Sequence, residues 1–289
     1  EGEPYAGDSR HVLERVVRRA AEDGYSFIVG PELEYFYFKD AEGTDVLDHG
    51  SYFDLTSLDS ASDLRRDTVL TLEKMGIPVE YSHHEKGPSQ HEIDLRYADA
   101  LSMADAVMTY KQVVKEIAMK HGVYASFMPK PMAGEPGSGM HVHQSLFDLD
   151  GNNAFFDARD PQGYRLSDVA KRYIAGILKY APEFCLVTNQ FVNSYKRLVC
   201  GGEAPTYLSW ASRNRSTLVR VPAARGSDCR VEVRSPDPSC NPYSTILLLI
   251  EAGLDGIERG LTPPAEITEN IYAMDAAARK VIEGAGYGD

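Results

Sequence analysis

Apolar residues recur along the chain at two spacings, one typical of helices and one typical of strands. Spacings of three and four predict amphipathic helices at 11–22, 64–75, 98–120, 168–180 and 243–257. Gly24 and Gly122 stand where the first and third of these helices should end. Ser167 and Pro242 stand where the last two should begin, since serine caps helices and proline is favoured in their first turn.

Strict alternation of apolar and polar residues predicts the strands. They are expected at 27–38, 92–96, 123–128, 139–147, 217–221 and 230–235. The first is rich in aromatic residues, and we expect Gly30-Pro31 to break it early. Helices and strands do not alternate regularly, so the pattern predicts an α+β domain with a large, mainly antiparallel sheet flanked by helices.

The composition mainly excludes certain structures and partners. No stretch approaches the roughly 20 apolar residues needed to span a bilayer. Acidic residues outnumber basic ones by 43 to 30, and the resulting net charge of −13 disfavours nucleic acid and anionic membranes as partners. The four cysteines form neither a C-x-x-C pair nor a zinc pattern, so reduced thiols and a cytoplasmic location are expected.

Three predicted strands carry charged or imidazole side chains on one face. Alternation places Glu32 and Glu34 together, although this pair alone favours a solvated strand face. It also groups His141, His143 and Ser145, which favours a ligand site somewhat over a structural role. The third group is Arg230, Glu232 and Arg234, for which a surface salt-bridge ladder is the simpler interpretation.

Two further segments add the same residue types. Residues 83–85 and 90–92 read His-His-Glu and Gln-His-Glu, and 213–216 read Arg-Asn-Arg-Ser with Arg220 nearby. Carboxylates with one imidazole suit Mg²⁺ or Mn²⁺ better than zinc, and guanidinium groups bind oxyanions in a bidentate manner. Metal plus arginine is typical of phosphoryl transfer. The residues alone therefore indicate a metal-dependent phosphoryl-transfer enzyme, although neither common Gly-rich nucleotide fingerprint is present.

Longer segments resemble the type I glutamine synthetase family over nearly the whole chain. The matching segments are HHE…QHEID, FMPKP, GSGMH, NSYKRLV, GEAP, RNRS, VEVRSPDP and NPY. The resemblance implies that residues 1–289 form the catalytic domain of this family. It also implies that a small N-terminal β-grasp domain and the C-terminal end are missing from the sequence as given.

The resemblance implies two or more Mg²⁺ or Mn²⁺ ions, two of them with separate ligand sets. The first set is Glu34, Glu85 and Glu92, and the second is Glu32, His141 and Glu232. Glu32 and Glu34 would thus serve neighbouring ions, which agrees with their shared strand face.

The resemblance also assigns substrate-handling residues. Arg215 and Arg234 would hold the transferring phosphate, and Arg197 and Arg220 would lie near the substrate carboxylate and the phosphates. The other assignments are His143 and Ser145 for ATP, Gly137 and Gly139 for the loop lining the glutamate site, and Glu203 for the flap that closes the site and takes a proton from the bound ammonium.

The implied activity is glutamate–ammonia ligation. ATP would phosphorylate the γ-carboxylate of glutamate to give γ-glutamyl phosphate, which ammonium then converts to glutamine. The family forms rings with active sites between subunits, so a homo-oligomer is expected. A non-catalytic scaffold is the alternative from another class, but all six metal ligands are present.

Two departures favour a second activity. Pro136 stands where the family commonly has an Asn that helps hold the α-amino group of glutamate, and proline offers neither a side-chain hydrogen bond nor an N–H. Gly202 stands where the flap usually has Tyr, which should loosen the flap and open space beside the amine site. Both changes resemble the branch of the family that joins polyamines or other larger amines to glutamate.

Overall fold

The computed structural model describes residues 2–55, 58–199 and 204–284. Its helices are α1 (Ser9–Glu22), α2 (Ser62–Lys74), α3 (Ala100–Lys120), α4 (Asp168–Thr188), α5 (Val192–Arg197), α6 (Pro242–Glu258) and α7 (Ala276–Gly284). Its strands are β1 (Tyr25–Phe38), β2 (Val79–His84), β3 (Gln90–Leu95), β4 (Ala98–Asp99), β5 (Tyr124–Ser126), β6 (Met140–Asp148), β7 (Trp210–Ser212), β8 (Val219–Val221) and β9 (Val231–Val233). Every predicted helix and strand therefore has a counterpart.

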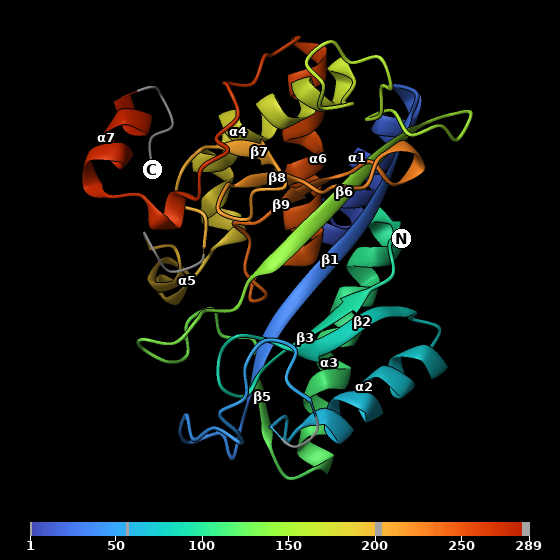
Figure 1. Cartoon of the computed structure of the whole chain (residues 1–289). Helices are drawn as coiled ribbons and strands as arrows, with labels where there is room; N and C mark the ends of the chain where they lie inside the picture. The colour runs from blue at the N-terminus through green and yellow to red at the C-terminus, as the bar shows by residue number, and fades with distance from the viewer. Residues whose placement is uncertain (1, 56–57, 200–203, 285–289) are drawn as a thin grey trace.

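The strands form a single sheet with β1 and β6 at its centre (Figure 1). The strand order is β2-β3-β1-β6-β9-β8-β7, and β4 and β5 also pair with β1. All the pairings are antiparallel except β7 with β8, which is parallel. The predicted α+β class with a mainly antiparallel sheet is confirmed.

The expectation that Gly30-Pro31 breaks the first strand is wrong, because β1 runs without interruption from Tyr25 to Phe38. Pro31 pairs with Val142 of β6 on one side. On the other side, residues 30 and 31 fall between the pairing with β4, at 28–29, and the pairing with β3, at 32–36. The missing N–H of proline therefore costs no sheet hydrogen bond on that side.

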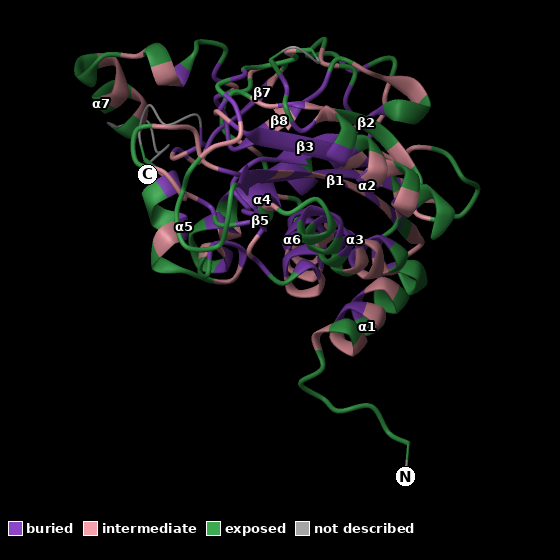
Figure 2. Ribbon diagram, turned by 90° about the horizontal axis from the view of Figure 1, so that it is seen from below, coloured by how far each residue is buried: buried purple, intermediate pink, exposed green. Residues whose placement is uncertain are grey.

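Helices α1, α3 and α6 lie on one face of the sheet, and loops lie over the other (Figure 2). Leu33, Ile93, Val142 and Val233 are buried in the core between sheet and helices. Helices α4 and α6 pack closely in this layer. A Cβ added at Gly253 of α6 would lie only 1.9 Å from the Tyr173 ring of α4, so glycine lets the two helices approach.

The structure differs from the sequence prediction at several boundaries, and β2, β4, β7, α5 and α7 were not predicted. Helix α4 continues past residue 180 and through Pro182, since Ala181 and Phe184 remain buried in the core. Strand β2 lies at the sheet edge, and its residues Glu80, Tyr81 and Ser82 are exposed, so no alternating pattern marks it. Among the described helices, none combines the length and apolarity needed to cross a bilayer.

Candidate active site

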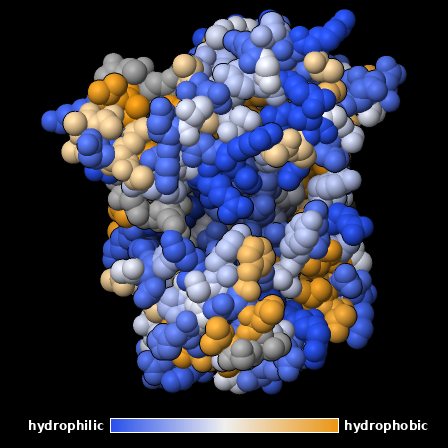
Figure 3. Space-filling model, viewed as in Figure 1, coloured by the Kyte–Doolittle hydropathy of each residue, from blue (hydrophilic) through white to orange (hydrophobic). Residues whose placement is uncertain are grey.

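A polar cavity of about 880 Å³ opens over the sheet face that the helices do not cover. Figure 3, which has the same view as Figure 1, shows a strongly hydrophilic surface around its centre. Most of the residues singled out from the sequence line the cavity. They are Glu32, Glu34, Glu85, Glu92, Gly137, His141, Arg197, Arg215, Arg220 and Arg234.

Strand register brings the acidic residues together. Glu32 of β1 pairs with Asp94 of β3 on one side and with His141 of β6 on the other. Glu34 pairs with Glu92 of β3. Because alternate residues of a strand share a face, all five side chains face the same side of the sheet.

The first predicted metal-ligand set lies where β2 and β3 meet β1. His83 Nε2 lies 2.9 Å from a carboxylate oxygen of Glu85 and 3.8 Å from one of Glu92. Glu34 accepts hydrogen bonds from the backbone N–H of Gly139, at 2.8 Å, and from the Gln90 amide, at 3.3 Å. Burial and the charge of Glu85 raise the pKa of Glu34 to about 8.

The second predicted set lies around Glu32. His143 Nε2 lies 2.6 Å from one of its oxygens, and His141 Nδ1 lies 3.3 Å from the other. Although burial acts in the opposite direction, these two imidazoles hold the pKa of Glu32 well below its ordinary value. His141 Nδ1 also lies 3.9 Å from a carboxylate oxygen of Glu232. Burial and nearby Arg234 lower the pKa of His141 to about 4, which favours the neutral imidazole that metals bind.

The donor atoms fit divalent cations. Burial, together with Asp94 and Glu34, raises the pKa of Glu92 well above its usual value, which shows acidic groups crowded without enough positive charge between them. Mg²⁺ and Mn²⁺ favour oxygen ligands with at most an imidazole. Ligand atoms of Glu32, His143 and Glu232 lie within 4.8 Å of one another, so by distance His143 joins the second set in place of the predicted His141.

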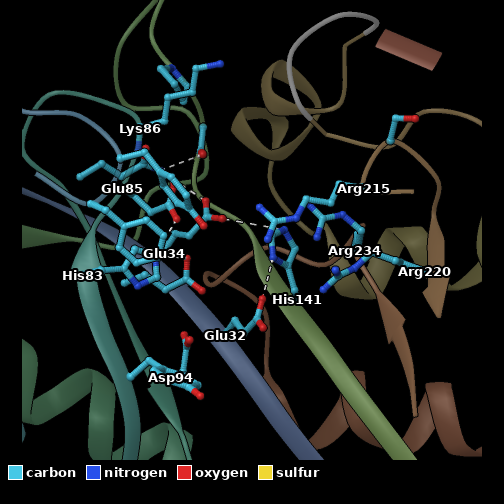
Figure 4. A pocket seen from close by; sticks show the side chains of 18 of the residues that line it. Glu32, Glu34, His83, Glu85, Lys86, Asp94, His141, Arg215, Arg220 and Arg234 are labelled. Atoms are coloured by element: carbon cyan, nitrogen blue, oxygen red, sulfur yellow. Dashed lines mark hydrogen bonds and ion pairs between the residues drawn. The ribbon is translucent and has the colours of Figure 1, made fainter. Parts of the chain in front are cut away.

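Basic side chains face this acidic half across the cavity (Figure 4). Glu232 is fully buried and lies between two arginines, with Arg220 Nε and Arg234 Nη1 each bonded to one of its oxygens. Although burial acts against it, the charge of Arg234 holds the pKa of Glu232 low. Arg215 is exposed beside them, so its guanidinium is available to an anion.

Arg197 packs against the loop of Gly137 and Gly139, which is predicted to line the glutamate site. It is buried, and its guanidinium donates to the backbone oxygens of Ser235, at 2.8 Å, and Arg234, at 3.1 Å. A Cβ at Gly139 would lie 2.5 Å from Arg197 Nη2, and one at Gly137 would lie 2.6 Å from the backbone oxygen of Pro129. Both positions therefore require glycine because the loop passes close over its neighbours.

Some predicted site residues lie elsewhere. Ser145 is directed to the backbone oxygen of Cys229, at 3.1 Å, and does not line the cavity. His143 lies beneath the lining, where Arg230 Nε donates to its Nδ1 at 3.1 Å. Glu203 and Gly202 fall outside the described residues, so their assignments stay predictions.

Among the lining residues that the sequence reasoning missed are Asp94 and Tyr52. Asp94 stands two positions after Glu92 on β3, so strand alternation could have placed it beside the metal ligands. Tyr52 lies in a loop far from every recognised segment, and its phenol contributes to raising the pKa of Arg215. No periodic signal marks a loop residue of this kind.

The chain matches the family model described as "Glutamine synthetase, catalytic domain" over residues 6–285. It is 54% identical to a glutamine synthetase of Clostridium saccharobutylicum, over 97% of this chain and 63% of the relative. It is 52% identical to a glutamine synthetase of Mycolicibacterium smegmatis, over 98% of this chain and 64% of the relative.

Two solved structures share the fold. The structure described as "Apo GmaS without ligand" has a TM-score of 0.85 and 31% identity and covers 99% of this chain and 64% of its own. The structure described as "GmaS/ADP complex-Conformation 1" has a TM-score of 0.86 and 32% identity and covers 94% and 64%. The chain thus spans about 63–64% of the length of these relatives.

Proposed function

Because this chain belongs to the glutamine synthetase catalytic-domain family, we propose that it carries the catalytic centre of an ATP-dependent glutamate–ammonia ligase. The observation that carries the proposal is the division of the cavity into two halves. Carboxylates and imidazoles gather on β1, β3 and β6, and arginines gather on the opposite side.

The acidic half is proposed to hold two divalent ions. Glu34, Glu85 and Glu92 would hold one, and Glu32, Glu232 and His141 or His143 the other. Ligand atoms of Glu32, His143 and Glu232 lie within 4.8 Å of one another, as do those of His83, Glu85 and Glu92. When bound, the ions would offset the charge of the phosphates and polarise the transferring phosphoryl group. A solved structure with the same fold is described as an ADP complex, which supports a nucleotide as a ligand of this chain.

The chain's own residues would then act on the substrates. Arg215 and Arg234 would hold the phosphoryl group as it passes from ATP to the γ-carboxylate of glutamate, since fixed guanidinium groups stabilise the charge of the transition state. Arg220 keeps Glu232 ionised and in place. Ammonium would attack the resulting acyl phosphate after losing a proton to Glu203, which is assigned by resemblance alone.

A γ-glutamyl ligase for a larger amine is the second candidate. Pro136 lines the cavity and offers no side-chain hydrogen bond where the family commonly uses Asn to hold the α-amino group. Its neighbour Gly137 lines the cavity too, so the change falls beside the substrate and not in a remote loop. The assembly of subunits into a homo-oligomer and a cytoplasmic location also stay predictions.

Phosphate release measured on the complete natural protein tests both candidates. With Mg²⁺, ATP and glutamate, we expect release that depends on ammonium. Release only with putrescine or another larger amine would support the second candidate, and Pro136→Asn would then be expected to lower the KM for glutamate. No release with any amine would contradict both and favour the scaffold alternative.

A further inference from the structure

A second buried polar cluster lies directly behind the acidic half of the cavity. It joins Asp48, which precedes the loop carrying Tyr52, to His84 at the end of β2 and to Ser89 in the turn before β3. His84 and Ser89 are 0% exposed and Asp48 is 9% exposed, so the cluster is shielded from water. None of the three lines the cavity, and none is used in the reaction proposed above.

Asp48 holds several segments together through one carboxylate. Its Oδ1 accepts hydrogen bonds from His84 Nε2, at 3.0 Å, and from the backbone N–H groups of Gly50 and Ser89, both at 3.1 Å. Its Oδ2 accepts from the backbone N–H of Ser60, at 3.0 Å. The carboxylate therefore connects both ends of one loop to the hairpin that carries Glu85 and Glu92.

His84 also contacts the backbone of Glu85, a predicted metal ligand. Its Nδ1 lies 2.6 Å from the backbone oxygen of Glu85. A carbonyl and a carboxylate can only accept, so both ring nitrogens donate and the ring orientation is fixed at two points. The backbone oxygen of His84 in turn accepts from the N–H of Phe53, at 3.0 Å.

Tight packing keeps the cluster in this arrangement. A Cβ at Gly50 would lie 2.7 Å from His84 Nε2 and 2.9 Å from the backbone oxygen of Leu58, so only glycine fits over the ring. Ser89 adopts a positive φ of 55°, which is uncommon for a residue with a side chain. Its hydroxyl accepts from the N–H groups of Leu47, at 2.6 Å, and Asp48, at 3.1 Å.

The loop fixed in this way reaches the arginine side of the cavity. The rings of Tyr52 and Phe53 lie 5.5 and 4.7 Å from the ring of His83, measured between centroids. Tyr52 lines the cavity together with Arg215, which is predicted to hold the phosphate, and its phenol contributes to raising the pKa of Arg215. The cluster thus contacts the acidic half through Glu85 and the basic half through Tyr52.

The cluster is not itself suited to a metal ion, although Asp48, His84 and His91 have ligand atoms within 4.8 Å of one another. Both nitrogens of His84 are already used. Arg65 lies with Nη1 2.8 Å from His91 Nδ1 and adds a positive charge where the ion would bind. The hydrogen bonds therefore indicate that this cluster links the loop after Asp48 to the hairpin of β2 and β3, and does not bind a metal.

We propose that Asp48 and His84 act as a positioning pair, which sets the Glu85 side chain for metal binding and holds Tyr52 against Arg215. This inference rests on the proposed function only in that Glu85 is taken as a metal ligand. Groups that orient metal ligands typically change metal affinity by about 10–100-fold when they are removed. A contact that only stabilised the fold would leave the affinity of the folded protein unchanged.

Mn²⁺ titration of the complete protein, followed by electron paramagnetic resonance, tests the proposal without any need for turnover. We expect Asp48→Asn to weaken Mn²⁺ binding by about 10–100-fold. In the ligase assay we expect kcat to fall more than the KM for ATP rises. Should Asp48→Asn not fold, Ser89→Ala takes its place, because it removes the hydroxyl that accepts from Leu47 and Asp48 and keeps both members of the pair.

Asp160→Asn is the matched control. Asp160 is 8% exposed, binds Lys171 at 2.7 Å and accepts from the backbone N–H groups of Gln162 and Leu166, but does not line the cavity. Equal Mn²⁺ affinity in both variants and the wild type would overturn the positioning role. A wild type that binds Mn²⁺ but releases no phosphate would contradict the proposed function alone. The Mn²⁺ affinities of the variants and the wild type would still test the positioning role. Failure of the wild type to bind Mn²⁺ would overturn both.

Discussion

Glu232→Gln is expected to abolish metal-dependent phosphate release and to lower the free energy of unfolding by about 3–5 kcal/mol. Glu232 is fully buried between Arg220 and Arg234, and loss of its charge leaves two guanidinium groups close together without a counter-ion. The same change removes a carboxylate that, with Glu32 and His143, forms a candidate metal site. Stability and activity should therefore fall together.

Urea unfolding and phosphate release of purified variants measure the two effects. Glu183→Gln is a suitable control, because Glu183 is exposed on α4, away from the cavity. The control should behave as the wild type in both assays. If Glu232→Gln retained wild-type turnover, Glu232 would neither bind a required metal nor place the arginines for catalysis.

Glu34→Gln is expected to act in opposite directions on stability and on metal binding. In metal-free protein, burial and the charge of Glu85 raise the pKa of Glu34 from 4.5 to about 8. A raised carboxyl pKa means that the folded state binds the proton more tightly than the unfolded state does. Stability is therefore lost as pH rises from about 4.5 to about 8, by an amount on the order of a few kcal/mol. Glutamine cannot ionise, so the variant should escape this loss.

Thermal unfolding in EDTA at pH 5 and pH 8, repeated with Mn²⁺, measures this effect. At pH 8 without metal, Glu34→Gln should be more stable than the wild type, and added Mn²⁺ should stabilise the wild type much more than the variant. Glu22→Gln, on the exposed surface of α1, provides the control. A variant that is destabilised in EDTA at pH 8 would show that the charge of Glu34 is already compensated within the protein.

Strand alternation predicted much of the site, because the side chains that matter stand on regular strands. Glu32 and Glu34, and likewise His141 and His143, share a face as expected, and all four lie at the cavity or directly beneath its lining. The alternation gave no information on which strands are neighbours. That Glu34 faces Glu92 across the sheet depends on pairing between segments more than 50 residues apart.

Loops account for most of what the sequence could not predict. Asp48 is hydrogen-bonded to His84, and Tyr52 contributes to raising the pKa of Arg215. Both partners are distant in sequence, and no local pattern predicts such contacts. The error at Gly30-Pro31 has a similar origin. A proline breaks a strand only where its N–H would be needed, and that depends on where β3 and β4 end along β1.

Transfer of oxygen from glutamate to phosphate tests the central claim most directly. If the cavity phosphorylates the γ-carboxylate, one carboxylate oxygen bridges to phosphorus and leaves with the phosphate when the amine attacks the carbonyl. Glutamate labelled with ¹⁸O in its γ-carboxylate should therefore yield phosphate carrying one ¹⁸O atom, with ammonium or with a larger amine as acceptor. Phosphate released without the label would show that ATP is hydrolysed by water and would contradict ligation through an acyl phosphate.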